Sequence, residues 1–236
     1  MKTGVIVVIV EGISDEDALY PHLRHISKKL NIRFEIINGD PFADKNNKTS
    51  VKSIVGNIIN QEILSRSEYK KSDIKMIIQL TDTDGAYIPD NKIKINQEQT
   101  IKTKYTETNI CVDTQIQYEE IAKRNKKKSN AMDTLSKTEN VVGNLPYKIL
   151  YFSRNLEHII INEPDMLENE KSKKATIFSE TLGGYAEFEQ FFKKSNFAVK
   201  GSYDETWDFI RQDANSLQRF SNFHLIFDLI SDLIQG

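Results

Sequence analysis

Two short acidic segments of this 236-residue chain carry residue types from which a catalytic or metal site can be built. The first is Glu11-Gly12, directly after the aliphatic run of residues 5–10 (VIVVIV), and the second is Asp82-Thr83-Asp84-Gly85. Burying an acid costs free energy, so Glu11 at the end of a buried run is more than an ordinary surface acid. Asp82 and Asp84 before a glycine also fit an ordinary Asx-type turn. The two segments together favour a functional site.

The chemistry of such a site follows from the carboxylates. Three carboxylates in close quarters raise one another's pKa values unless a cation neutralises them. Oxygen ligands without histidine or thiolate nearby favour Mg²⁺ or Mn²⁺ over zinc, and the four histidines show no metal-ligand spacing. The chemistry that needs this arrangement is mostly phosphoryl transfer. We therefore expect Glu11, Asp82 and Asp84 to be catalytic around Mg²⁺ (or Mn²⁺).

The elements that must position these acids alternate between strand and helix. Six β-branched residues in a row predict a first strand that is buried on both faces, as in a parallel sheet. Ser14 is a plausible N-cap for the helix that follows. Further strands are predicted over residues 33–38, 74–81 and 148–152, with helices between the first three. This βαβαβ order implies right-handed crossovers and a parallel sheet, so the acids at its carboxyl ends lie where α/β proteins bind ligands.

The rest of the chain divides into an insertion and a helical end. Residues 86–146 are polar and predict an insertion or lid with one or two helices, such as residues 115–123. Residues 166–236 predict a helical region with an aromatic stripe at Phe188, Phe191 and Phe192, packed on the core. The α/β core is expected to comprise residues 1–85 and 147–165.

Composition limits the classes of function. The formal net charge of −2 and the pI of about 6.1 exclude a histone-like binder that relies on bulk positive charge. A single cysteine, Cys111, gives no internal disulfide, and the apolar run of residues 5–10 is too short for a membrane span, which needs about 20 residues. We therefore expect a cytoplasmic protein.

The two acidic segments resemble the sequence motifs of TOPRIM domains. Residues 7–16 (VVIVEGISDE) are similar to the first TOPRIM motif in the form found in OLD-family nucleases, and residues 80–85 (LTDTDG) are similar to the Asp-x-Asp motif. The resemblance implies a Rossmann-like fold in which Glu11 acts as general acid/base while Asp82 and Asp84 hold Mg²⁺. It also implies that Asp15 joins the metal site; on spacing alone, Asp15 is a helix-dipole acid.

A looser resemblance concerns Glu157. TOPRIM-like defence proteins often carry a glutamate that opens a helix after a polar strand end, here residues 153–157 (SRNLE). Glu157 is therefore an additional candidate ligand, and the alternative is an ordinary acid in a first helical turn.

A basic run offers a candidate surface for nucleic acid. By default it is a solvated face, but next to an anionic metal site it could bind phosphates. The candidate residues are Lys123, Arg124, Lys126, Lys127 and Lys128.

Three functions compete on this evidence. The leading prediction is a Mg²⁺-dependent nuclease acting on DNA or RNA, such as tRNA, as the effector of a phage-defence (abortive-infection) system with a separate ATPase subunit, and as a homodimer. The second is a haloacid-dehalogenase-like phosphatase with Asp82 as nucleophile, Asp84 as acid/base and Ser153 as phosphate binder. The third is a non-catalytic module that docks a partner through its C-terminal helices.

Overall fold

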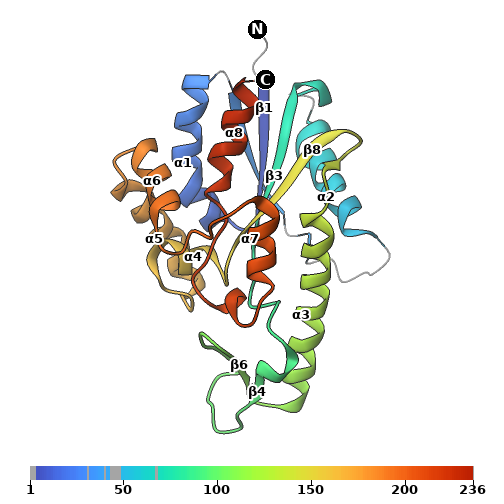
Figure 1. The fold of residues 1–236 in the computed structure, drawn as a ribbon, viewed down its shortest axis with the longest axis vertical. Coiled ribbons are helices and arrows are strands. Elements are labelled where there is room, and N and C mark those ends of the chain that lie inside the picture. Colours follow the sequence, from blue (N-terminus) through green and yellow to red (C-terminus); the bar gives the residue numbers. More distant parts are fainter. Residues whose placement is uncertain (1–3, 31, 40, 43–48, 67–68, 236) are drawn as a thin grey trace.

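A central five-stranded sheet organises the computed structural model, which describes residues 4–30, 32–39, 41–42, 49–66 and 69–235 (Figure 1). The strand order is β2-β1-β3-β8-β7, in which β1 pairs in parallel with β2 and β3, β3 pairs in parallel with β8, and β7 is antiparallel to β8. The strand bounds are β1 Gly4–Val10, β2 Ile32–Asn38, β3 Ile74–Asp82, β7 Asn140–Val141 and β8 Leu145–Phe152. The predicted α/β class with a mostly parallel sheet is confirmed.

Strand β1 lies at the centre of the core, and all seven of its residues are buried. Because successive side chains of a strand point to opposite faces, Ile6, Val8 and Val10 enter one hydrophobic cluster, and Val5, Val7 and Ile9 enter another. Helices cover both faces, so β1 has no solvent-facing side that would call for polar residues.

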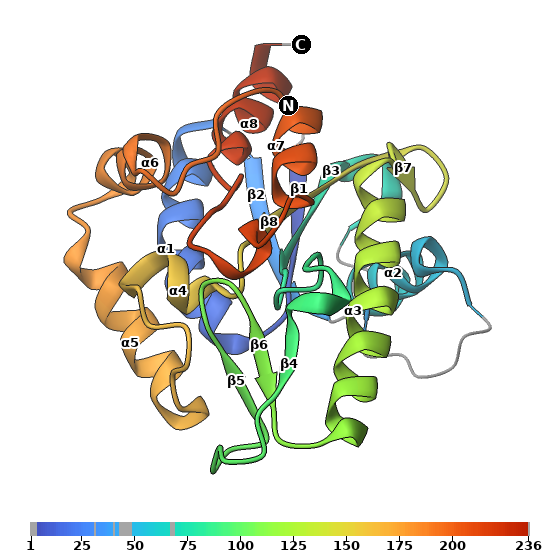
Figure 2. The ribbon, with the colours of Figure 1, turned by 60° about the horizontal axis from the view of Figure 1, so that its bottom comes forward.

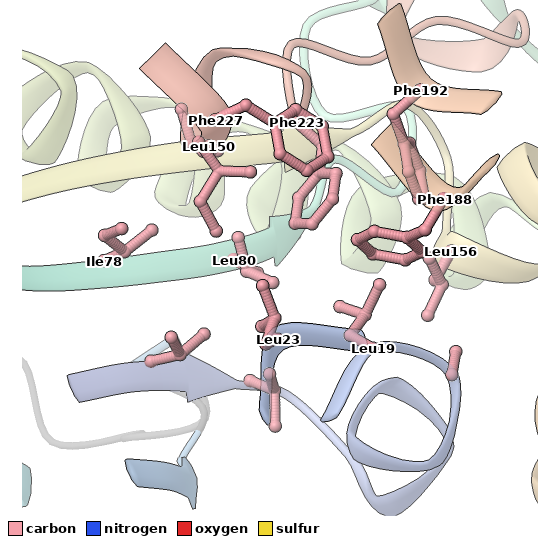
Figure 3. Packing of buried hydrophobic residues seen from close by; sticks show 14 of the residues in the cluster. Leu19, Leu23, Ile78, Leu80, Leu150, Leu156, Phe188, Phe192, Phe223 and Phe227 are labelled. Atoms are coloured by element: carbon pink, nitrogen blue, oxygen red, sulfur yellow. The ribbon is translucent and has the colours of Figure 1, made fainter. Parts of the chain in front are cut away.

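One face of the sheet is covered by helices from the N-terminus and from the last third of the chain (Figure 1). Figure 3 shows Phe188, Phe192, Phe223 and Phe227 packed in one cluster with Leu80 and Leu150 of the sheet. The rings of Phe192 and Phe223 have centroids 4.5 Å apart. The helices on this face are α1 Ile13–Leu30, α4 Leu156–Ile161, α5 Glu168–Thr181, α6 Tyr185–Lys194 and α8 Leu225–Gln235.

The other face carries α2 (Val51–Ile59), α3 (Gln115–Ser136) and α7 (Tyr203–Ile210). A π-helical turn, Asn60–Leu64, continues α2. Met132 and Leu135 of α3 and Trp207 of α7 are buried in the cluster on this face. Helix α3 is longer than the predicted helix of residues 115–123, and its second half packs against the core.

A small second sheet projects from one end of the molecule (Figure 2). It consists of β4 (Ile93–Ile95), β5 (Thr103–Tyr105) and β6 (Ile110–Val112) in the order β4-β6-β5. Its core is shared with the first half of α3 and with one residue of the C-terminal region; the buried members are Ile88, Ile93, Ile110, Val112, Ile121 and Leu217. Short 3₁₀ turns span Lys71–Asp73, Asp90–Lys92 and Asn215–Leu217.

The prediction that Ser14 is an N-cap is wrong. Helix α1 begins at Ile13, so Ser14 lies inside its first turn and is not the N-cap. The Ser14 hydroxyl instead donates to Glu157, which the fold brings beside it. Residues 46–48 are polar and predict a loop in the sequence, and they lie outside the described residues. Among the described helices, none has the length and apolar character needed to cross a membrane.

Candidate active site at the carboxyl edge of the sheet

Glu11 and Asp82 lie side by side because β1 and β3 are neighbouring parallel strands. Glu11 directly follows β1, and Asp82 is the last residue of β3. The Glu11 Oε1 atom accepts hydrogen bonds from the Thr81 hydroxyl at 2.6 Å and from the Asp82 backbone N–H at 3.1 Å. The end of β3 therefore fixes the orientation of the Glu11 carboxylate.

Asp15 anchors the turn between β1 and α1. One oxygen of its carboxylate, Oδ2, accepts from the backbone N–H groups of Glu11 and Gly12, each at 3.1 Å. Burial raises the pKa of Asp15 to about 6, assisted by repulsion from Glu157 and opposed by the hydrogen bonds from Gly12 and Glu11. The ionised form of the Asp15 carboxylate is therefore electrostatically unfavourable in the folded protein.

The surroundings of Asp82 disfavour its charged form. Burial and then repulsion from Glu11, Asp15 and Asp84 raise its pKa well above the ordinary value. Within the described part of the chain, no N–H or O–H group donates to its carboxylate. A partly buried carboxylate that lacks donors among the described residues and faces other carboxylates is an acceptor for a cation.

The turn after β3 carries Asp84 away from Asp82. Backbone N–H groups of Thr83 and Asp84 donate to the carbonyls of Phe152 (2.9 Å) and Arg154 (3.0 Å), which fastens the turn to the end of β8. Asp84 (φ 49°) and Gly85 (φ 68°) both adopt the left-handed conformation. A Cβ at Gly85 would also lie 2.4 Å from the Leu217 side chain, so glycine is required there.

Asp84 forms an ion pair with Lys128 of α3. Its Nζ lies 2.5 Å from Asp84 Oδ2 and 3.7 Å from Glu11 Oε1, and the residue is 7% exposed. Burial acts to lower the pKa of Lys128, but the Glu11 and Asp84 charges outweigh burial and hold it above the ordinary value. Burial acts in turn to raise the pKa of Asp84, and the Lys128 charge reverses this and lowers it.

A pocket of about 460 Å³ opens on the other side of the carboxylates. The acids Glu11, Asp15, Asp82 and Glu157 line it, and α5 contributes Lys171. The remaining lining residues are Gly12, Ile13, Ser14, Glu168 and Ser172. Asp84 and Lys128 are absent from this lining, as far as the described residues go. The predicted acids are thus brought to one sheet edge but not to one cavity.

Glu157 joins the site by way of β8 and α4. It is 3% exposed, follows the strand that pairs with β3, and accepts a hydrogen bond from Ser14 Oγ at 3.2 Å. Asn155 caps α4 by accepting from the His158 N–H, which leaves the Glu157 carboxylate on the pocket side of the first turn. The fold thus places this acid in the pocket wall.

Sequence reasoning missed Lys171. Its ammonium is 2.8 Å from Glu168 Oε2, its side chain is 27% exposed, and its charge acts on Glu157 and Asp82. The sequence offers no signal for it, because α5 reaches the pocket only by packing against α1, far away in the chain.

The predicted basic run divides between two faces of α3. Lys123, Lys126 and Lys127 are exposed. Arg124 points inward, where its guanidinium donates to the Asp84 carbonyl at 2.8 Å and to the Tyr105 hydroxyl at 2.6 Å, and Lys128 is buried beside Asp84. Three of the five candidates therefore present positive charge to solvent.

The donor set fits a hard divalent cation better than zinc, because the pocket acids supply only oxygen atoms. Among the described residues, no three His, Cys, Asp or Glu side chains converge closely enough to form a ready-made metal cage. Mg²⁺ is usually held by one or two carboxylates, with waters and substrate phosphates completing its shell, so such a cage is not required. Asp82, to which no described group donates a hydrogen bond, and the neighbouring Glu11 provide the one or two carboxylates that Mg²⁺ needs.

Comparisons with protein-family models, with curated proteins and with solved structures found no match for this chain. The resemblance to TOPRIM domains therefore depends on the two sequence motifs alone and stays a prediction.

Proposed function

We propose that this protein is a metal-dependent nuclease of TOPRIM type, which cleaves phosphodiester bonds in DNA or RNA. The observation that carries the proposal is the Asp82 carboxylate, which lacks a donor among the described residues and shares one pocket with Glu11, Asp15 and Glu157. A Mg²⁺ or Mn²⁺ ion bound there would offset the negative charge that builds on phosphate oxygens during cleavage.

The roles of the chain's own residues follow from their contacts. Asp82 would be the principal ligand, because a cation would offset both the desolvation of its carboxylate and the repulsion from the neighbouring acids. Glu11, fixed by Thr81 and the Asp82 amide, would serve as second ligand or as the group that accepts and returns a proton. Asp15 and Glu157 would complete the acidic wall on the α1 and α4 sides.

One lysine in the pocket lining and three exposed lysines on α3 support a polyanionic substrate. Lys171 places an ammonium in the pocket lining, where it would attract a phosphate that the carboxylates alone would repel. The exposed Lys123, Lys126 and Lys127 of α3 would contribute phosphate contacts along a longer strand. We propose a role as the effector of a phage-defence system, with a separate ATPase subunit and a homodimeric assembly.

Two observations count against the phosphatase alternative. Ser153 is fully buried and its hydroxyl donates to the Asn215 carbonyl at 2.8 Å, so it does not face a substrate phosphate. The Asp84 carboxylate, which that mechanism needs as acid/base, is paired with Lys128.

The test is cleavage of labelled DNA, RNA and tRNA by the purified chain, with and without a partner ATPase, in Mg²⁺, Mn²⁺ or EDTA. We expect cleavage only with a divalent ion, loss of cleavage in Asp82→Asn, and loss of turnover with retained binding in Glu11→Gln. Asp90→Asn, an exposed acid outside the pocket, is the matched control. Cleavage that survives EDTA or Asp82→Asn would refute the proposal, and turnover of small phosphomonoesters alone would favour the phosphatase.

A further inference from the structure

Helix α3 places a buried ammonium group directly among the site carboxylates. Lys128 Nζ contacts Asp84 Oδ2 at 2.5 Å and Glu11 Oε1 at 3.7 Å, and it lies 5.2 Å from the centroid of the Phe42 ring. An ammonium that is 7% exposed needs such partners, because burying an unpaired charge is strongly unfavourable. The group is thus held by two carboxylates and an aromatic face.

The backbone around this ammonium is fastened as well. One helical turn before Lys128, Arg124 donates to the Asp84 carbonyl at 2.8 Å, and Asn125 donates to the Gly85 carbonyl at 3.5 Å. Three side chains of α3 therefore bind the turn that follows β3. The ammonium belongs to a fixed junction between helix and turn.

The junction divides the two aspartates of the Asp-x-Asp motif. Asp82 lines the 460 Å³ pocket together with Glu11, Asp15 and Glu157, whereas neither Asp84 nor Lys128 belongs to the described lining. Asp84 already has a cation in contact, and Asp82 has no donor among the described residues. A divalent ion that enters the pocket would therefore bind Asp82, whereas the Lys128 ammonium contacts Glu11 from outside the pocket lining.

We infer that Lys128 is a built-in cation that takes the place of a second metal ion, so that the site binds one divalent ion and Asp84 serves as the counter-ion of Lys128. Sites for phosphoryl transfer often hold two ions about 3.5–4 Å apart, bridged by shared carboxylates. In this protein Glu11 is the shared carboxylate, and a fixed positive charge stands 3.7 Å from it. A second divalent ion on that side would be repelled by the ammonium and would find Asp84 engaged.

This inference depends on the proposed metal-dependent function, and a direct count of bound ions separates the two. Mn²⁺ is titrated into the purified full chain at neutral pH without nucleic acid, by calorimetry and by electron paramagnetic resonance of the free ion. We expect one Mn²⁺ per chain for the unmodified protein and for Lys128→Arg, which keeps the positive charge, and two per chain for Lys128→Met. Two ions in the unmodified protein, or one in Lys128→Met, would overturn the inference and leave the nuclease proposal standing. No bound ion would refute both.

A second variant keeps the test decisive if Lys128→Met does not fold. The double variant Asp84→Asn/Lys128→Met removes both members of the ion pair and leaves no unpaired charge between them. It should bind one Mn²⁺ with an affinity within about threefold of the unmodified chain, because Asp84 is not a ligand. Asp82→Asn should weaken binding by at least about tenfold, since even loss of a residue that only orients a ligand costs about 10–100-fold. A tenfold loss in the double variant would place Asp84 among the ligands and overturn the inference.

Discussion

Replacing Asp15 by asparagine should stabilise the metal-free protein at neutral pH. Burial and the Glu157 charge raise the pKa of Asp15 from 3.8 to about 6. The two values differ by about 2, and each pKa unit corresponds to about 1.4 kcal/mol, so ionised Asp15 costs the fold about 3 kcal/mol. Asparagine carries no charge and keeps one oxygen that can accept from the Glu11 and Gly12 amides.

The sign of the pH dependence gives this prediction a clear signature. Because the folded-state pKa is raised, the contribution of Asp15 to stability is fully present below about pH 4 and is lost as the pH rises through 6. Asp15→Asn should therefore be more stable than the unmodified chain by up to about 3 kcal/mol at pH 7.5, or about 6–12 °C in Tm, with no such gain at pH 4.

The measurement is urea and thermal unfolding at both pH values in EDTA, repeated with Mg²⁺. Glu16→Gln neutralises an acid on the same helical turn and serves as the control, since both changes remove one charge from the N-terminus of α1. Mg²⁺ should raise the Tm of the unmodified chain more than that of Asp15→Asn. A loss of stability in Asp15→Asn that is equal at pH 4 and pH 7.5 would show that its two backbone hydrogen bonds outweigh the electrostatic cost.

Three further predictions concern other parts of the molecule. Lys128→Met should lower the free energy of unfolding in urea by about 3–5 kcal/mol, because it leaves Asp84 without its ion-pair partner. The double variant that also carries Asp84→Asn should lose clearly less stability, and equal losses would contradict the ion-pair argument. Neutralising the exposed lysines of α3 should lower the salt dependence of duplex-DNA binding by about 0.9 in log–log slope for each phosphate that is no longer neutralised, and an unchanged slope would make them a solubility feature. The variants for that test are Lys123→Gln, Lys126→Gln and Lys127→Gln. Burial, aided by Arg154 and Arg219, lowers the pKa of His158 to about 4, so the protein should lose stability as the pH falls from about 6.5 to 4, and His158→Gln should lose less.

The sheet and its acidic edge could be predicted from the sequence because they depend on local patterns. A run of β-branched residues marks a doubly buried strand, and the strand–helix alternation makes β1 and β3 parallel. Glu11 and Asp82 at the ends of these strands are then placed at one edge of the sheet. Their direct contact also requires β1 and β3 to be neighbours, which the strand order provides and the alternation alone does not fix. The strand and helix patterns themselves need only residues that are close in the sequence.

The split between Asp82 and Asp84 could not be predicted in the same way. It depends on left-handed backbone at Asp84 and Gly85. This backbone is held by hydrogen bonds to the carbonyls of Phe152 and Arg154, and Leu217 packs so closely that only glycine fits at residue 85. These contacts join segments that are distant in the sequence. Glu157 and Lys171 reach the pocket through similar long-range packing.

The inward position of Lys128 did leave a signal. Ile121, Lys128, Met132 and Leu135 recur at helical spacing, so a helix that runs through residue 135 places Lys128 on its buried face. When the helix is predicted to end at residue 123, this periodicity is not seen, and Lys128 is interpreted as part of the exposed basic run.

The contact between Ser14 and Glu157 has a consequence for synthesis of the chain. The two residues are 143 positions apart, and at about 5–20 residues per second a ribosome needs roughly 7–29 s to travel from one to the other. During that interval the nascent chain carries the β1–α1 turn and then the Asp-x-Asp turn, but no α4 or α5 to close the acidic wall. During that interval the proposed nuclease would lack its full site while it is attached to the messenger that encodes it, and a chain truncated before Glu157 would never acquire the full site.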